Sequence, residues 1–127
     1  MAAADTNVLV RLLQRDDPAQ LRKAMAFLER NGRLWISGAV LTETVWVLMS
    51  VYAWDKPKLL AMLQAAMESK DFAFQDQAAV QAAVRLFPKV KAGFVDCLAV
   101  ELAKAHGESP LATFDKVASK LPGAVAP

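Results

Sequence analysis

The sequence predicts an α/β fold in three layers, with a short central parallel sheet of four to five strands flanked by helices. Short apolar runs alternate with longer segments whose apolar residues recur every three or four positions, which is the helical period. The intervening segments are long enough for the crossover helices that parallel strands need. With 127 residues, 55% of them apolar and 22% charged, the chain can bury the core of one domain spanning residues 1–127.

The predicted strands are brief, apolar and bounded by turn or capping residues, which is typical of strands buried in a parallel sheet. Leu34-Trp35-Ile36 and Phe72-Ala73-Phe74 fit this description best. The first strand is bland, because Ala2-Ala3-Ala4 stands where branched residues are expected. The predicted strands are residues 2–4, 34–36, 72–74, 111–113 and 124–126.

Helix-capping residues divide the rest of the chain. Asp5 or Thr6 can cap the first helix, and Asp17 followed by Pro18 can begin the second. Asp76 is the expected cap of a later helix that stops at Pro88, and Asp55-Lys56-Pro57 is expected to break the chain between two helices. The predicted helices lie between Asp5 and Asp16 and at about 18–31, 37–52, 58–69, 76–87 and 94–106, with a short one at 115–120.

Charge and cysteine content exclude some classes of protein. Fifteen basic and 13 acidic residues give a net charge of +2, which is too small to indicate a nucleic-acid partner but would not repel one. Cys97 is the single cysteine, so neither an internal disulfide nor a cysteine zinc site can form. The start of the chain lacks a signal peptide pattern, and no stretch is apolar enough to span a membrane. We therefore expect a cytoplasmic protein with no membrane partner.

Four acidic residues lie beside apolar sequence at the start or on the inner side of predicted helices: Asp5, Glu43, Asp96 and Asp115. Asp5 and Asp115 follow predicted strands, so a single parallel sheet would place both at its carboxyl edge, where α/β folds bind ligands. Asp96 lies in the first turn of a helix that could reach the same edge. Glu43 has apolar neighbours in sequence and is not expected to face open water completely.

Grouped carboxylates require a cation. At ~4 Å and an effective dielectric constant of about 20, two like charges repel by about 4 kcal/mol. Oxygen ligands without paired histidine or cysteine favour Mg²⁺ or Mn²⁺, and such ions support phosphodiester hydrolysis. Taken singly, however, the three aspartates also fit helix caps or helix-dipole partners, and Glu43 fits an exposed ion pair.

Four segments, at residues 5–10, 41–48, 94–99 and 113–116, resemble in order those of PIN-domain ribonucleases, most closely the VapC toxins of VapBC toxin–antitoxin pairs. The resemblance implies an endoribonuclease dependent on Mg²⁺ or Mn²⁺ that hydrolyses RNA, such as tRNA or rRNA. It assigns Asp5, Glu43, Asp96 and Asp115 as catalytic and metal-binding residues. Asp5 and Asp96 would be the direct ligands, and Glu43 and Asp115 would complete the acidic pocket.

The same resemblance assigns supporting residues and partners. Asn7 would help to hold Asp5, and Thr113 could hydrogen-bond a carboxylate or water. Many relatives carry an Asp where this chain has Gly93. The resemblance therefore does not decide whether the site binds one metal ion or two. The implied partners are an RNA substrate, an antitoxin protein and a second copy of the chain in a homodimer.

Two other functions remain open from the residues alone: a non-catalytic PIN-like module that binds a partner, and a phosphatase-type hydrolase with Asp5 as nucleophile. The second would usually need an Asp at position 7, which is Asn7. Several residues outside the acidic set have structural explanations. We expect Trp35 and Trp46 in the core, leave Trp54 open, assign structural roles to His106 and Cys97, and regard Arg11, Arg15, Lys89 and Lys91 as solvated residues that could also contact phosphate.

Overall fold

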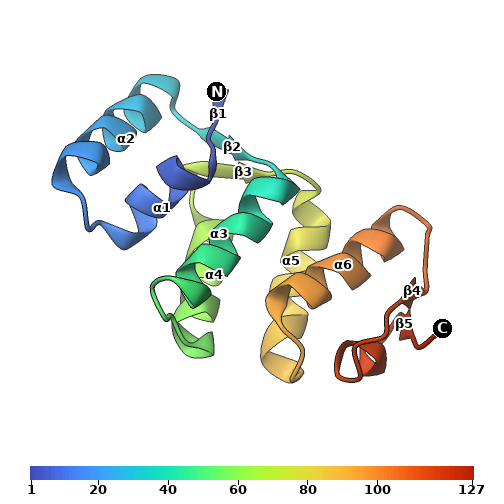
Figure 1. Ribbon diagram of the computed structural model, residues 1–127. Helices are drawn as coiled ribbons and strands as arrows, with labels where there is room; N and C mark the ends of the chain where they lie inside the picture. Colours follow the sequence, from blue (N-terminus) through green and yellow to red (C-terminus); the bar gives the residue numbers. More distant parts are fainter. The chain divides into compact units, whose positions relative to one another are not determined.

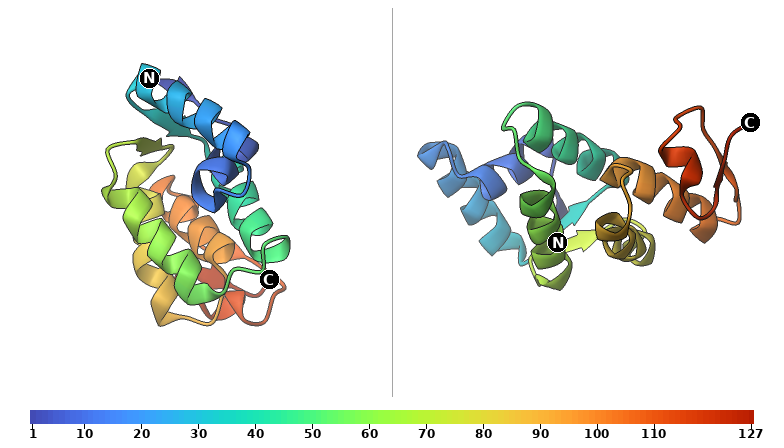
Figure 2. Two further views of the ribbon diagram at one scale, coloured as in Figure 1. Left: turned by 90° about the vertical axis from the view of Figure 1, so that its left-hand side faces the viewer. Right: turned by 90° about the horizontal axis from the view of Figure 1, so that it is seen from below.

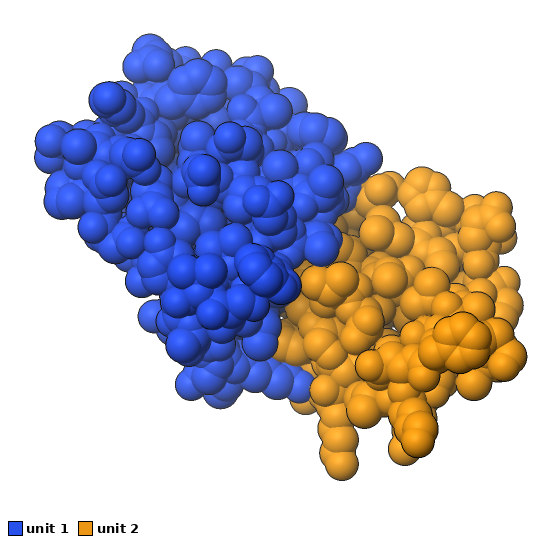
Figure 3. All heavy atoms as spheres, in the orientation of Figure 1, with its two compact units in different colours: residues 1–75 blue, residues 76–127 orange.

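The computed structural model describes all residues 1–127, and the chain divides into two compact units, unit 1 at residues 1–75 and unit 2 at residues 76–127 (Figure 3). All five predicted strands form, and every pairing is parallel. They make a three-stranded sheet in unit 1 and a two-stranded sheet in unit 2, whereas the sequence predicted one sheet. None of the helices is both long and apolar enough to cross a membrane.

The sheet of unit 1 has the order β1-β2-β3, formed by Ala2–Ala3, Leu34–Ile36 and Phe72–Phe74 (Figure 1). The central strand β2 pairs on both sides, with Leu34 opposite both Ala2 and Phe72. Leu34 and Ile36 are completely buried. The alanine segment does form the first strand, because it pairs with the backbone of β2. This pairing does not depend on the side chains of the alanine segment.

The helices of unit 1 begin where the capping residues predict. Asp5, Asp17, Ser37 and Asp55 each accept a hydrogen bond from a backbone N–H of the first helical turn. The segment expected as a break, Asp55-Lys56-Pro57, is therefore the cap and first turn of a helix, where proline is tolerated. These helices are α1 (Thr6–Gln14), α2 (Pro18–Asn31), α3 (Gly38–Ser50) and α4 (Lys56–Glu68).

Within unit 1, α1 packs against α2 and α3, and α4 packs against α3 (Figure 2). The buried stripe of α3 consists of Leu41, Thr44, Val45 and Leu48. Trp46 lies off this stripe and is 62% exposed, so its predicted place in the core is wrong. Apolar residues occur on all sides of α3, so the sequence alone does not identify the side that packs against the rest of unit 1.

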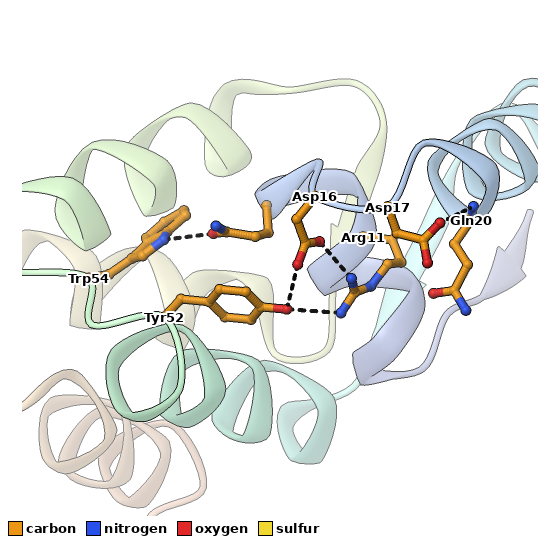
Figure 4. A network of polar contacts seen from close by, with 7 residues as sticks. Arg11, Asp16, Asp17, Gln20, Tyr52 and Trp54 are labelled. Atoms are coloured by element: carbon orange, nitrogen blue, oxygen red, sulfur yellow. Dashed lines mark hydrogen bonds and ion pairs between the residues drawn. The ribbon is translucent and has the colours of Figure 1, made fainter.

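A polar network joins the end of α1 to the loop after α3 (Figure 4). Arg11 Nη1 donates to Asp16 Oδ1 at 2.6 Å and Nη2 donates to Tyr52 Oη at 3.0 Å, while the tyrosine hydroxyl donates to Asp16 Oδ2. Trp54 is buried beside this network, and its Nε1 donates to Gln14 Oε1 at 2.9 Å. The position of Trp54, which the sequence left open, is therefore structural.

Unit 2 consists of α5 (Gln77–Leu86), η1 (Phe87–Lys89), α6 (Phe94–Ala105), β4 (Leu111–Ala112), η2 (Ala118–Lys120) and β5 (Ala124–Val125). Helices α5 and α6 pack together, and β4 pairs with β5. The rings of Phe87 and Phe94 meet edge to face at 5.8 Å. Cys97 is fully buried in α6, as expected for a structural thiol.

The helix that was predicted to stop at Pro88 does end there: α5 ends at Leu86, and Pro88 lies in the short 3₁₀ segment η1 that follows. Two other predictions for unit 2 need correction. The short helix predicted at 115–120 is a 3₁₀ turn over its last three residues only. Asp76 occupies the N-cap position of α5, but its side chain makes no capping hydrogen bond: its φ is 53°, and its Oδ1 lies 3.2 Å from His106 Nε2.

Thr44 provides a test of the packing of α3. It is completely buried, and its Oγ1 has no hydrogen-bond partner. Replacing it with valine removes an unpaired polar atom at nearly constant shape, so Thr44→Val should raise the free energy of unfolding by about 1 kcal/mol. Urea denaturation measures this change, with half-exposed Thr42→Val as the matched control on the same helix. If Thr44→Val lowers the free energy of unfolding by that amount, the Thr44 hydroxyl is hydrogen-bonded in the folded chain and the prediction is wrong.

Candidate active site

Asp5 stands between β1 and α1. Its backbone is extended (φ −90°, ψ 178°), and its Oδ1 accepts a hydrogen bond from Val8 N at 3.1 Å. Asp5 therefore caps α1, which the sequence analysis gave as the alternative to metal binding. The capping bond fixes the direction of the carboxylate. A carboxylate has two oxygens, so an exposed cap can still offer one to a cation. Asn7 is exposed at the start of α1; the bond that holds Asp5 comes from Val8 instead.

Glu43 lies in α3 and is exposed, so its apolar neighbours in sequence do not bury it. The neighbouring Thr44 and Val45 take the buried positions. Glu43 and Trp46 are three residues apart, which places them on one side of the helix. The exposed side of α3 therefore carries an acid and a large aromatic ring together.

Asp96 and Asp115 form the acidic pair of unit 2. Asp96 is half-buried in the first turn of α6. Asp115 follows β4, and its Oδ1 accepts hydrogen bonds from Val117 N at 2.9 Å and Ala118 N at 2.8 Å. Its backbone N–H donates to Thr113 Oγ1 at 3.1 Å, so Thr113 supports the acidic residue through the main chain.

The two carboxylates of unit 2 interact electrostatically. Partial burial raises the pKa of Asp96, and the charge of Asp115 raises it further. Each contribution disfavours the ionised form of Asp96. Both residues belong to the set of four that was predicted from sequence, and their mutual repulsion is the property that a bound cation would relieve.

Gly93 occupies the N-cap position of α6 and provides no side-chain bond to the helix. Its φ of −69° is accessible to any residue, and a Cβ placed there would have nothing within 4 Å. The glycine is therefore not required by the backbone. The position where the family resemblance implies an additional Asp is structurally open in this chain.

The donor set fits a hard cation, since Asp96 and Asp115 offer carboxylate oxygens that repel one another. Neither unit by itself contains a group of three or more His, Cys, Asp or Glu side chains arranged to hold a metal ion. Asp5 and Glu43 belong to unit 1, whereas Asp96 and Asp115 belong to unit 2. The joint action of all four residues therefore stays a prediction.

Unit 1 contains a groove of about 590 Å³ that the sequence did not predict. Residues of β1, α1 and α2 line it, and we call it the α1–α2 groove. The small side chains of Ala3 and Ala4 leave it open, and this run of alanines was its only sequence signal. Its polar lining is Asp5, Asn7, Arg11, Gln20 and Lys23, and its apolar lining is Ala3, Ala4, Val8, Ala24 and Phe27.

Comparison with known proteins assigns the family. The PIN domain model matches residues 2–124, which is nearly the whole chain and includes parts of both units. The chain belongs to the PIN-domain family. The predicted resemblance and α/β fold class are thereby confirmed.

A VapC ribonuclease from Aquifex aeolicus (strain VF5) is similar to this PIN domain. The two are 23% identical over 124 residues, which are 95% of this chain and 92% of the relative. The similarity therefore extends over nearly the full length of both proteins. No solved structure gives a significant match.

The raised pKa of Asp96 predicts a pH dependence of stability. An acid whose pKa is higher in the folded chain binds more protons there, so stability falls as pH rises from about 3.9 through the raised pKa. Asp96→Asn removes this effect. The melting temperature of Asp96→Asn relative to wild type should therefore increase between about pH 3 and neutral pH.

Thermal denaturation across that pH range checks this prediction in metal-free buffer. The control is Glu108→Gln, which changes an exposed carboxylate in the same unit. A difference between Asp96→Asn and wild type that does not vary with pH would contradict the assignment.

Proposed function

We propose that this PIN domain is a metal-dependent endoribonuclease that acts as the toxin of a toxin–antitoxin pair in the cytoplasm. The observation that carries this proposal is the full-length similarity to PIN domains and to a VapC ribonuclease, combined with four acidic residues in the expected order. The proposed catalytic and metal-binding residues are Asp5, Glu43, Asp96 and Asp115. The proposed ion is Mg²⁺ or Mn²⁺.

When bound, the ion would polarise a phosphoryl oxygen and lower the pKa of water. The chain's own contribution is to hold oxygens in fixed directions. The Val8 N–H fixes Asp5, and two backbone N–H groups fix Asp115. In the metal-free chain, burial and the charge of Asp115 raise the pKa of Asp96, and a bound cation would relieve this repulsion.

The proposed partners include an antitoxin protein and a second copy of the chain. A homodimer would use the apolar surface formed by Trp46 and Met49 of α3 and by Val51, which directly follows this helix. These side chains are 62%, 41% and 64% exposed, and large apolar side chains gathered on one helix commonly mark interfaces. An antitoxin would neutralise the acidic residues with a basic side chain, as the metal ion does.

Substitution of Asp5 separates its two roles. Asparagine caps helices as well as aspartate does but carries no charge. Asp5→Asn should therefore keep the melting temperature nearly unchanged while lowering RNA cleavage with Mg²⁺ or Mn²⁺ by about 100-fold or more. Asp96→Asn should cause a similar loss, whereas the surface control Glu29→Gln on α2 should cleave at the wild-type rate.

Cleavage of labelled RNA, with and without a chelator, measures these rates. If wild-type protein cleaves no RNA with either ion and Asp5→Asn behaves identically, the ribonuclease proposal fails and a non-catalytic binding module becomes the better explanation. A phosphorylated Asp5 trapped during turnover of a phosphate ester would instead support the phosphatase-type alternative.

The proposed dimer surface has its own test. A charge at Trp46 would be buried without a partner in a dimer, so Trp46→Glu should convert a dimer into a monomer. Sedimentation equilibrium measures the mass, with Met25→Glu on the exposed side of α2 as control. A wild-type monomer, or a Trp46→Glu dimer as stable as wild type, would rule out this surface.

A further inference from the structure

The α1–α2 groove begins at Asp5, so a ligand that reaches this carboxylate also meets the groove. Asn7 and Arg11 continue its lining along α1, because residues four apart share one face of a helix. Gln20 and Lys23 line it from α2. The groove therefore presents one amide and one cationic side chain on each helix.

The cations outnumber the acids of the lining, where Asp5 is the only carboxylate. Lys23 is exposed and has no ion-pair partner. Arg11 is held in place by Asp16 and Tyr52, which occupy one donor on each of its two terminal nitrogens. Each of these nitrogens has a second N–H, so the fixed guanidinium can still bind an anion.

Between the charged groups the groove is apolar. Val8 contributes from α1, and Ala24 and Phe27 contribute from α2. A flat aromatic ring fits such a surface, and stacking of a base on an aromatic side chain is a common mode of binding single-stranded nucleic acid. The volume of about 590 Å³ is within the range of ordinary ligand sites.

We propose that the α1–α2 groove holds a nucleotide of the RNA adjacent to the bond that is cleaved. Its phosphate lies on Lys23 and Arg11, and its base packs against Val8 and Phe27. The amides of Asn7 and Gln20 then read the edge of the base. This inference rests on the proposed ribonuclease function and names the part of unit 1 that binds substrate.

The chemistry favours a nucleotide over a protein segment. An apolar peptide would use Val8, Ala24 and Phe27, and its backbone could pair with the two amides, but it would leave the charge of Lys23 without a partner. A nucleotide uses all three kinds of group at once, because it combines an anion, a flat ring and a polar edge. A protein segment is the alternative that remains if the groove variants below do not affect RNA binding.

The test measures binding of a short randomised single-stranded RNA by fluorescence anisotropy, in chelator to prevent cleavage, over a range of salt concentrations. Lys23→Gln should weaken binding and reduce the slope of log affinity against log salt by about 0.7, the value for one lost phosphate contact. Lys70→Gln, an exposed lysine of unit 1 outside the groove, should leave the slope unchanged. Lys23 is chosen because Arg11 also supports the network at the end of α1.

A second pair of variants tests the base. Ala3→Val narrows the groove without changing charge, and valine suits a strand, so the fold should persist. It should weaken RNA binding about tenfold at an unchanged salt slope. Ala2→Val, on the same strand but outside the groove lining, is the matched control and should bind as wild type does.

The outcomes separate this inference from the proposed function. If the wild-type protein cleaves RNA but Lys23→Gln and Ala3→Val leave RNA affinity unchanged, the groove assignment is overturned. The ribonuclease proposal then stands. If the wild-type protein binds RNA through the groove but never cleaves it, the ribonuclease proposal fails and the groove assignment stands. No measurable RNA binding by wild type overturns the groove assignment outright.

Discussion

The three-stranded parallel ladder of unit 1 is the constraint on which the position of Asp5 depends. Strand β2 pairs on both sides with only three residues, and its buried Leu34 and Ile36 anchor it. The chain leaves β1 through the Asp5 cap and leaves β2 through the Ser37 cap. After β3, Gln75 Oε1 accepts a hydrogen bond from Gly38 N at 2.9 Å. Loss of the pairing between β1, β2 and β3 would free the starts of α1 and α3 to move.

The candidate residues combine structural and chemical demands. Asp5 and Asp115 each satisfy backbone N–H groups with one oxygen, so their carboxylates are directed before any ligand binds. Asp96 has no such compensation and is destabilised in its ionised form. Caps and ligands are therefore not competing explanations of an aspartate: a carboxylate that is already oriented loses less conformational freedom when it binds a cation.

Sequence patterns predicted every strand and the order of the helices, because capping side chains and apolar periodicity act locally. They failed where the answer depends on packing partners. Trp46 was placed in the core although α3 turns it outward, and Asp76 was read as a cap although it pairs with His106. The α1–α2 groove was missed because it is formed by the packing of β1, α1 and α2, which local sequence patterns do not specify. The family resemblance, not spacing, assigned the acidic residues.

Gly93 has an evolutionary consequence. Some glycine codons become aspartate codons through a single-nucleotide change, and no backbone torsion or neighbouring atom of this chain opposes that side chain. Aspartate is also a better helix cap than glycine, so the change would not reduce folding stability through α6. A lineage could therefore gain or lose an additional carboxylate beside Asp96 without passing through an unfolded intermediate. Backbone and packing therefore impose little restriction at this position, and the remaining cost of a further carboxylate is its repulsion from Asp96 and Asp115, which a bound cation would offset.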